Sequence, residues 1–269
     1  MTGIESLVLG VLQGVTEFLP VSSTGHLILA RSLFGITDTY ALAFDAVLHL
    51  ATAAAVILYF HKDLWNLFQA LLRKLSRLPV NETDLTVLKA IAVGTIPAVL
   101  LGLSLENIMA TLFRSPLLVA AVLVVGSGLF VYAEWVYQKR IPNNEMTIKK
   151  GLLIGLFQCL ALVPGMSRSG ATIAGGMLLG LTRSESARFA FLLAIPVILG
   201  AGSKKLLELI ASDGQVSLAP VALGAAAAFV TGLIAIHFML SFVRKYSLWP
   251  FIWYRLFLAA LVVFIVLYG

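Results

Sequence analysis

The sequence predicts an all-α, polytopic membrane protein built from two inverted-topology repeats, each a re-entrant broken-helix hairpin followed by three transmembrane helices. Three observations support this fold. The 269 residues are 60% hydrophobic and only 12% charged, whereas soluble domains are about 45–50% apolar and about 25% charged. Several apolar runs approach the roughly 17–25 residues that a helix needs to cross a bilayer. Finally, the same proline-broken pattern occurs twice, 145 residues apart.

The first half of the chain begins with a segment, 5–34, that is too polar in its middle for one plain span. It is better described as two half-helices joined by a turn at membrane depth, which is tolerated only where protein or a water-filled cavity surrounds the backbone. The loop 61–89 has apolar residues at helical spacing, which predicts an amphipathic interfacial helix. The predicted crossings of this repeat, which occupies about residues 1–138, are 41–60, 86–104 and 116–137.

The second half, about residues 149–269, repeats this plan with a re-entrant segment at 151–180. Its predicted crossings are 186–202, 218–240 and 251–268. A shift of 145 residues matches Gly10 with Gly155, Gln13 with Gln158, Ser22 with Ser167, and Gly25 with Gly170. Matched leucines mean little in apolar sequence, but matched Gln, Ser and Gly around one turn indicate a duplication. The chain is therefore expected to form one membrane domain, 1–269, with its site near the midplane.

The charges predict the orientation in the membrane. The net charge of +6 does not indicate nucleic-acid binding, because the basic residues lie in short loops, as the positive-inside rule expects. Placing 61–89, 138–150 and 241–250 in the cytoplasm gathers five, four and two Lys or Arg there, whereas 105–115 and 203–217 hold one and two. Three crossings per repeat then invert the second half and leave both termini on the non-cytoplasmic side.

The first turn carries a carboxylate and an amide inside apolar sequence. Gln13 and Glu17 are four residues apart and share a helix face, and Pro20 ends the half-helix. An ionisable group within a span is a functional hypothesis by default. The alternatives are a structural carboxylate at Glu17 and an interhelical hydrogen bond at Gln13.

A hydroxyl cluster starts the next half-helix, at Ser22, Ser23 and Thr24. These side chains are expected at least to cap the helix, and the exposed N–H groups of a helix start also form an anion site. His26 falls in the first turn, within reach of a serine hydroxyl, and is a candidate base or nucleophile.

The second turn supplies the opposite charge. Arg168 occupies the position of Ser23 in the repeat, and its planar guanidinium matches phosphate oxygens. The alternative is a purely structural ion pair with Glu17. The hydroxyls predicted to bind phosphate with it are Ser167, Ser169 and Thr172, together with Ser22 and Thr24 of the first hairpin. These groups in a membrane predict phosphoryl transfer on a lipid-borne phosphate.

Two long motifs, QGVTEFLPVSSTGH (13–26) and PGMSRSGAT (164–172), resemble those of the undecaprenyl-diphosphate phosphatase family, the integral bacitracin-resistance type. The resemblance covers essentially the whole chain. It implies an enzyme of the bacterial plasma (inner) membrane that removes the terminal phosphate of a C55 polyprenyl diphosphate, recycling the lipid carrier of peptidoglycan synthesis. It also implies a site open to the periplasmic side and a divalent cation, Mg²⁺ or Ca²⁺.

The same resemblance implies roles for the matching residues. Glu17 is an essential acid and a metal contact, Ser23 with His26 forms the catalytic pair, and Arg168 clamps the diphosphate. The first acidic position of the family is Gln13 in this chain, so a metal contact there would be a neutral amide. Whether Ser23 or His26 attacks phosphorus stays open, with His26 assisting Ser23 favoured. Two further candidates on the following span are Asp45 and His49.

Two other classes of function compete with the enzyme. A flippase or transporter of the same lipid phosphate, or a bifunctional protein, fits because inverted repeats with broken helices are a transporter layout. A carrier, however, needs a clamp but no nucleophile or base such as Ser23 and His26. A structural scaffold does not explain Glu17 and Arg168. The expected partners are the polyprenyl diphosphate lipid and the membrane, with a homodimer left open and no nucleic acid.

Overall fold

The computed structural model describes residues 1–36, 41–105, 115–211 and 218–268, and all regular structure in these ranges is helical. The helices are, in chain order, α1 (Gly3–Phe18), α2 (Ser23–Phe34), α3 (Ala41–Tyr59), α4 (His61–Leu75), α5 (Glu82–Ser104), α7 (Pro116–Lys139), α8 (Ile148–Cys159), the 3₁₀ turn η2 (Leu160–Leu162), α9 (Arg168–Leu178), α10 (Arg183–Ala211), α11 (Leu218–Val243) and α12 (Trp249–Tyr268). The all-α prediction is therefore confirmed.

Five of these helices are long and apolar enough to cross a membrane: α5, α7, α10, α11 and α12. Helix α3 passes the same test together with α4, from which it is bent by 77°. The described part of the chain thus has five or six candidate spans, and the protein is a multi-pass membrane protein. The predicted amphipathic segment is α4, which buries Leu67 and Ala70 and exposes Trp65, Phe68 and Leu72.

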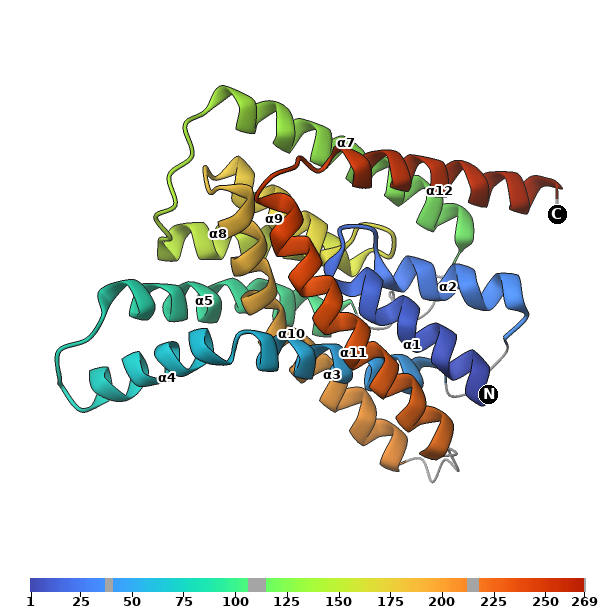
Figure 1. The fold of residues 1–269 in the computed structure, drawn as a ribbon, viewed down its shortest axis with the longest axis horizontal. Coiled ribbons are helices and arrows are strands. Elements are labelled where there is room, and N and C mark those ends of the chain that lie inside the picture. The colour runs from blue at the N-terminus through green and yellow to red at the C-terminus, as the bar shows by residue number, and fades with distance from the viewer. Residues whose placement is uncertain (37–40, 106–114, 212–217, 269) are drawn as a thin grey trace.

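Both predicted hairpins are broken helices. Helix α1 stops at Phe18 because Leu19, the residue before Pro20, takes an extended conformation, as residues before proline prefer. The second hairpin passes from α8 through η2 to an extended Val163 before Pro164. Figure 1 shows α2 running back beside α1, and α9 running back beside α8, so neither hairpin continues across the molecule.

The predicted boundary of one loop is wrong. The segment 203–217 was expected to be a loop, but α10 continues to Ala211, because Lys204 to Leu209 includes several good helix formers and no proline or glycine. The remainder of that loop, 212–217, lies outside the described residues, as does most of the predicted loop 105–115.

The first helix of each half packs against a helix of the other half. Helix α1 packs along α11 of the second half, and α8 packs along α5 of the first. Gly10 and Gly155, matched in the repeat, sit at these two crossings. A Cβ at either would overlap a backbone carbonyl, that of Gly224 or of Gly94. This reciprocal packing supports the duplication, while the inverted orientation of the halves stays a prediction.

The largest apolar cluster surrounds the ends of the two hairpins. It includes Phe18 from α1, Phe130 from α7, Ile173 from α9 and Phe191 from α10. The Phe18 and Phe191 rings meet edge to face with centroids 5.4 Å apart, a favoured aromatic geometry. This packing fixes the end of α1, and with it Glu17, against the second hairpin.

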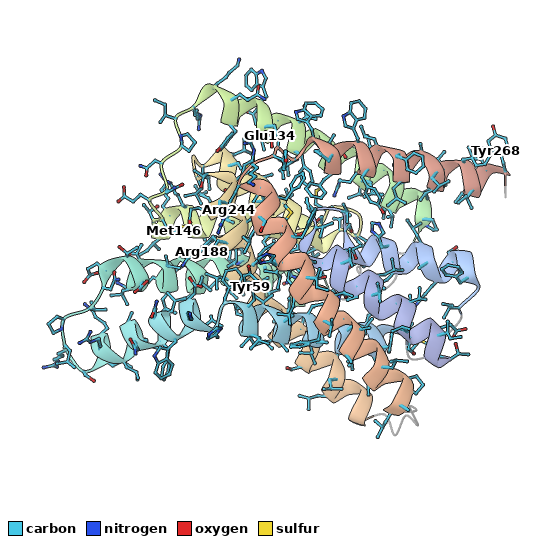
Figure 2. The ribbon with its side chains drawn as sticks, viewed as in Figure 1. Tyr59, Glu134, Met146, Arg188, Arg244 and Tyr268 are labelled. Carbon is cyan, nitrogen blue, oxygen red and sulfur yellow. The ribbon has the colours of Figure 1, made fainter. Side chains whose placement is uncertain are left out.

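The two ends of the molecule differ. Both termini lie at one end, opposite the α4–α5 and α7–α8 connections (Figure 1). Arg188 and Arg244 lie toward the end with the α4–α5 and α7–α8 connections, whereas Tyr268 lies near the end with the two termini (Figure 2). Helix α1 begins at the end with the termini, and α8 begins at the opposite end (Figure 1). The two hairpins therefore run toward each other, and their turns meet in the middle of the molecule.

Candidate active site

The turns of the two hairpins are bonded to each other. The Ser22 hydroxyl oxygen accepts from the Gly165 N–H at 3.1 Å, and the Ser169 hydroxyl donates to the Leu19 carbonyl at 3.1 Å. Ser22 and Ser167 also have matching backbones, with φ of 74° and 73°, and each caps its helix. The starts of α2 and α9 are therefore held next to each other, and the N–H groups of a helix start attract anions.

Arg255 of α12 holds this junction from behind. Its side chain is fully buried and donates to the carbonyls of Pro20 at 3.2 Å, Met166 at 3.1 Å and Gly165 at 3.0 Å. It also donates to the Leu123 carbonyl of α7. One guanidinium thus satisfies backbone acceptors of both turns, which have no water to bond in a membrane.

Glu17 is the centre of the site. Its Oε2 accepts from the Ser23 hydroxyl at 2.6 Å and from Gln13 Nε2 at 2.9 Å. Its Oε1 accepts from Arg168 Nη2. The carboxylate is almost completely buried, where an uncompensated charge would be very unfavourable. Its charge is balanced by Arg168 of the other hairpin, so the ion pair that the sequence suggested is present.

His49 of α3 joins this network. Its Nδ1 lies 3.4 Å from Glu17 Oε2 and 2.9 Å from Gln13 Nε2. The sequence named His49 only as a residue that could lie near the site. The structure places it in contact with the central carboxylate.

The favoured pairing of His26 with Ser23 does not appear in the structure. Its Nδ1 bonds to the Ser22 carbonyl at 2.8 Å, and its Nε2 bonds to the Tyr254 hydroxyl at 2.7 Å, with the two rings stacked. Both ring nitrogens are therefore engaged. The reason is local: a histidine at the fourth residue after Ser22 points back along the first turn of α2. Glu17, rather than His26, is bonded to the Ser23 hydroxyl.

The network opens on a cavity of about 330 Å³ between the two hairpins, α3, α5 and α10. The predicted residues that line it are Glu17, Ser22, Ser23, Thr24, Ser167 and Arg168, together with the further candidates Asp45 and His49. Two other predicted phosphate ligands have different bonds. Ser169 bonds to the Leu19 carbonyl, and Thr172 bonds to the Arg168 carbonyl at 2.7 Å, so both hold the hairpin backbone.

Asp45 also lines the cavity, but it is not part of the Glu17 network. Its two oxygens accept from Arg31 at 2.8 and 2.6 Å. This bidentate pair joins α3 to α2 beside the cavity. Asp45 is thus near the site, as the sequence suggested, with its charge already balanced.

The residues present fit a divalent cation only if the substrate shares it. Among the described residues, no three His, Cys, Asp or Glu side chains form a metal-binding cluster. Gln13 Oε1 is buried beside the Glu17 carboxylate and has no hydrogen-bond partner within the described ranges. Mg²⁺ is commonly held by one or two carboxylates together with substrate phosphates. Glu17 and Gln13 are thus suited to supply the protein oxygens.

Sequence reasoning did not identify two residues that support the site, Arg255 and Tyr254. Arg255 had a detectable signal, because it is the only charged residue in the apolar run 251–268, and a charge within a span is rarely incidental. Tyr254 had none, since tyrosine is common in membrane helices near their ends.

A serine hydroxyl that donates to a buried carboxylate, beside an arginine and two helix starts and surrounded by candidate spanning helices, is the arrangement of a multi-pass membrane enzyme. The sequence comparisons identify which one. Residues 6–261 match the family described as bacitracin resistance protein BacA, and the chain belongs to that family.

Curated relatives cover almost the full chain. The undecaprenyl-diphosphatase of Rubrobacter xylanophilus is 43% identical over 96% of this chain and 96% of its own. Those of Trichlorobacter lovleyi and Nitrosococcus oceani are each 41% identical, over 94% and 98% of this chain and 93% and 99% of their own. The family that the motifs suggested is therefore confirmed.

Proposed function

We propose that this protein hydrolyses undecaprenyl diphosphate to the monophosphate and inorganic phosphate; its relatives are named undecaprenyl-diphosphatase. The observation that carries this proposal is the contact of the Ser23 hydroxyl with Glu17 at 2.6 Å, beside Arg168. It supports a site in which Ser23 is the nucleophile, Glu17 is the base and Arg168, from the other hairpin, binds the anion.

The geometry supports attack by Ser23. Its hydroxyl already donates to Glu17 Oε2, so Glu17 is placed to take the proton as the oxygen attacks the terminal phosphorus. The bond from that phosphorus to the bridging oxygen breaks, and the lipid monophosphate leaves. Glu17 passes its proton to the departing monophosphate and becomes a carboxylate again. A water then attacks the phosphoserine and gives a proton to Glu17. As the bond from phosphorus to the Ser23 oxygen breaks, Glu17 returns this proton to that oxygen, which restores the hydroxyl and releases phosphate.

Charge is stabilised by groups of both hairpins. Arg168 and the N–H groups at the starts of α2 and α9 face the position of the phosphoryl oxygens, where charge accumulates in the transition state. The cavity wall beyond them is apolar, with Ala98, Leu162, Val197 and Ile198. Such a wall suits the first isoprenoid units of a lipid.

A divalent cation, Mg²⁺ or Ca²⁺, would be held by Glu17 and Gln13 together with the diphosphate. It would neutralise phosphate charge and orient the leaving group.

We also propose that the cavity opens to the periplasmic side of the inner membrane. Support comes from the basic residues of the predicted cytoplasmic loops and from the termini lying at the opposite end. In a Cys159→Ala background, a cysteine replacing Thr2 should react with an impermeant maleimide in intact cells. A cysteine replacing Arg140 should react only after permeabilisation. The reverse pattern would show the opposite orientation.

The experiment that tests the activity is phosphate release from undecaprenyl diphosphate by the purified protein in detergent with Mg²⁺ or Ca²⁺. We expect turnover by the wild-type protein and almost none after Arg168→Ala. Wild-type protein that binds the lipid without releasing phosphate would refute the proposed phosphatase activity and favour the alternative function, a flippase.

A further inference from the structure

Gln158, in the last turn of α8, is a polar side chain that the proposed chemistry does not use. It is 2% exposed. Neither its amide nitrogen nor its amide oxygen has a hydrogen-bond partner within the described part of the chain. A glutamine in a membrane helix usually bonds to a neighbouring helix. An unpartnered buried amide is therefore unusual and points to a bond that forms only with a ligand.

The repeat defines where this side chain points. Gln158 matches Gln13, and each lies three residues after a glycine, Gly155 or Gly10, that contacts the backbone of a crossing helix. Residues with the same spacing from such a crossing share a helix face. The amide nitrogen of Gln13 bonds to Glu17 and His49, whereas Gln158 lines the cavity.

The groups around Gln158 indicate which class of ligand it binds. The same cavity holds Arg168, ten residues further along the second hairpin, and the hydroxyls of Ser23 and Ser167. These are groups that bind phosphate oxygens. A primary amide adds two N–H donors without a charge, and because neither of its atoms is engaged, it can turn its nitrogen toward an anion.

We propose that Gln158 is a direct diphosphate-binding residue, which donates from Nε2 to a phosphate oxygen of the bound substrate. This inference rests on the proposed function for its natural ligand, but inorganic pyrophosphate carries the same chemistry. Arg168 and Gln158 would then grip the diphosphate from the second hairpin, while Ser23 and Glu17 act on it from the first.

The test is Gln158→Leu, which keeps the approximate volume and removes both donors. Gln138→Leu is the control, because Gln138 is exposed on α7. We expect the KM for undecaprenyl diphosphate to rise about tenfold or more with kcat within about threefold of wild type. The thermal midpoint without ligand should not fall, since no protein hydrogen bond is lost. Gln138→Leu should change neither constant.

A second readout separates this proposal from the enzymatic one. Pyrophosphate should raise the thermal midpoint of the wild-type protein and of Gln138→Leu, and this shift should be lost in Gln158→Leu. A lost shift in a protein without turnover would support the role of Gln158 and refute the activity. Wild-type KM and an unchanged shift in Gln158→Leu would overturn the proposal. So would a lowered midpoint without ligand, because it indicates a structural bond, or a wild-type protein that pyrophosphate does not stabilise.

Discussion

At the scale of single residues, the Glu17 carboxylate combines two tasks. One oxygen is held by Arg168 of the second hairpin, and the other accepts from Ser23 and Gln13. The ion pair keeps a charged group stable at membrane depth, where a lone charge is expensive. The other oxygen orients the Ser23 hydroxyl and, in the proposed mechanism, takes its proton.

This division of tasks predicts the effect of two substitutions. Glu17→Gln should lower phosphate release by about 10²–10⁴-fold, the usual contribution of a general base. Ser23→Ala should remove the acid-stable phosphoserine that wild-type protein forms in rapid-quench experiments, together with most turnover. Mass spectrometry of quenched samples measures the adduct. The exposed Ser104 provides the control, Ser104→Ala. Undiminished turnover in Ser23→Ala would show that another group attacks.

Much of the site at this scale could be predicted from the sequence. Glu17, Ser23 and Arg168 stand out because polar groups in apolar helices require partners. The partners themselves were harder to predict. His26 was paired with Ser23 on spacing along one helix, yet its ring turns back to Ser22 and across to Tyr254, 228 residues away. A contact between distant helices leaves no local pattern.

At the scale of secondary-structure elements, the site depends on two turns with backbone groups that no regular helix satisfies. The Arg255 side chain donates to backbone carbonyls of both turns. Gly126 of α7 leaves room for it, since a Cβ there would collide with the guanidinium. The hairpins are thus coupled through α12 as well as directly. Arg255 is a positioning residue, because it bonds to backbone rather than lining the cavity.

This coupling predicts that Arg255→Met lowers both stability and activity. Methionine fills the space but cannot donate, and each orphaned buried carbonyl costs about 1–3 kcal/mol. The thermal midpoint in detergent should fall and kcat should drop more than tenfold, with Arg255→Lys intermediate. Arg244→Met, at an exposed residue labelled in Figure 2, should resemble wild type. Wild-type kcat in Arg255→Met would mean that the turns do not need this link.

The helix crossings make a separate prediction about packing. Gly10→Ala and Gly155→Ala should each lower the thermal midpoint, because the added methyl meets a backbone carbonyl that cannot move aside, and overpacking costs about 1–3 kcal/mol. Gly128→Ala is the control on α7, where a Cβ has open space. It should be neutral or slightly stabilising, since alanine favours helix over glycine by about 1 kcal/mol. Equal midpoints in all three variants would refute the close crossings.

At the scale of the whole molecule, composition predicted the helical membrane fold, and the repeat predicted two broken hairpins. Both follow from the bilayer, which requires long apolar helices and makes each interruption conspicuous. The reciprocal packing of α1 on α11 and α8 on α5 was not predicted. Small residues permit many helix pairs, so sequence alone does not select one.

The central claim is that one residue from each hairpin builds a single site. A double-mutant cycle of phosphate release with Glu17→Gln, Arg168→Gln and the double variant tests it most directly. Residues in contact give non-additive effects, so the double variant should lose far less activity than the product of the two single losses. A loss equal to that product would contradict the claim, because it would mean that the two hairpins act independently.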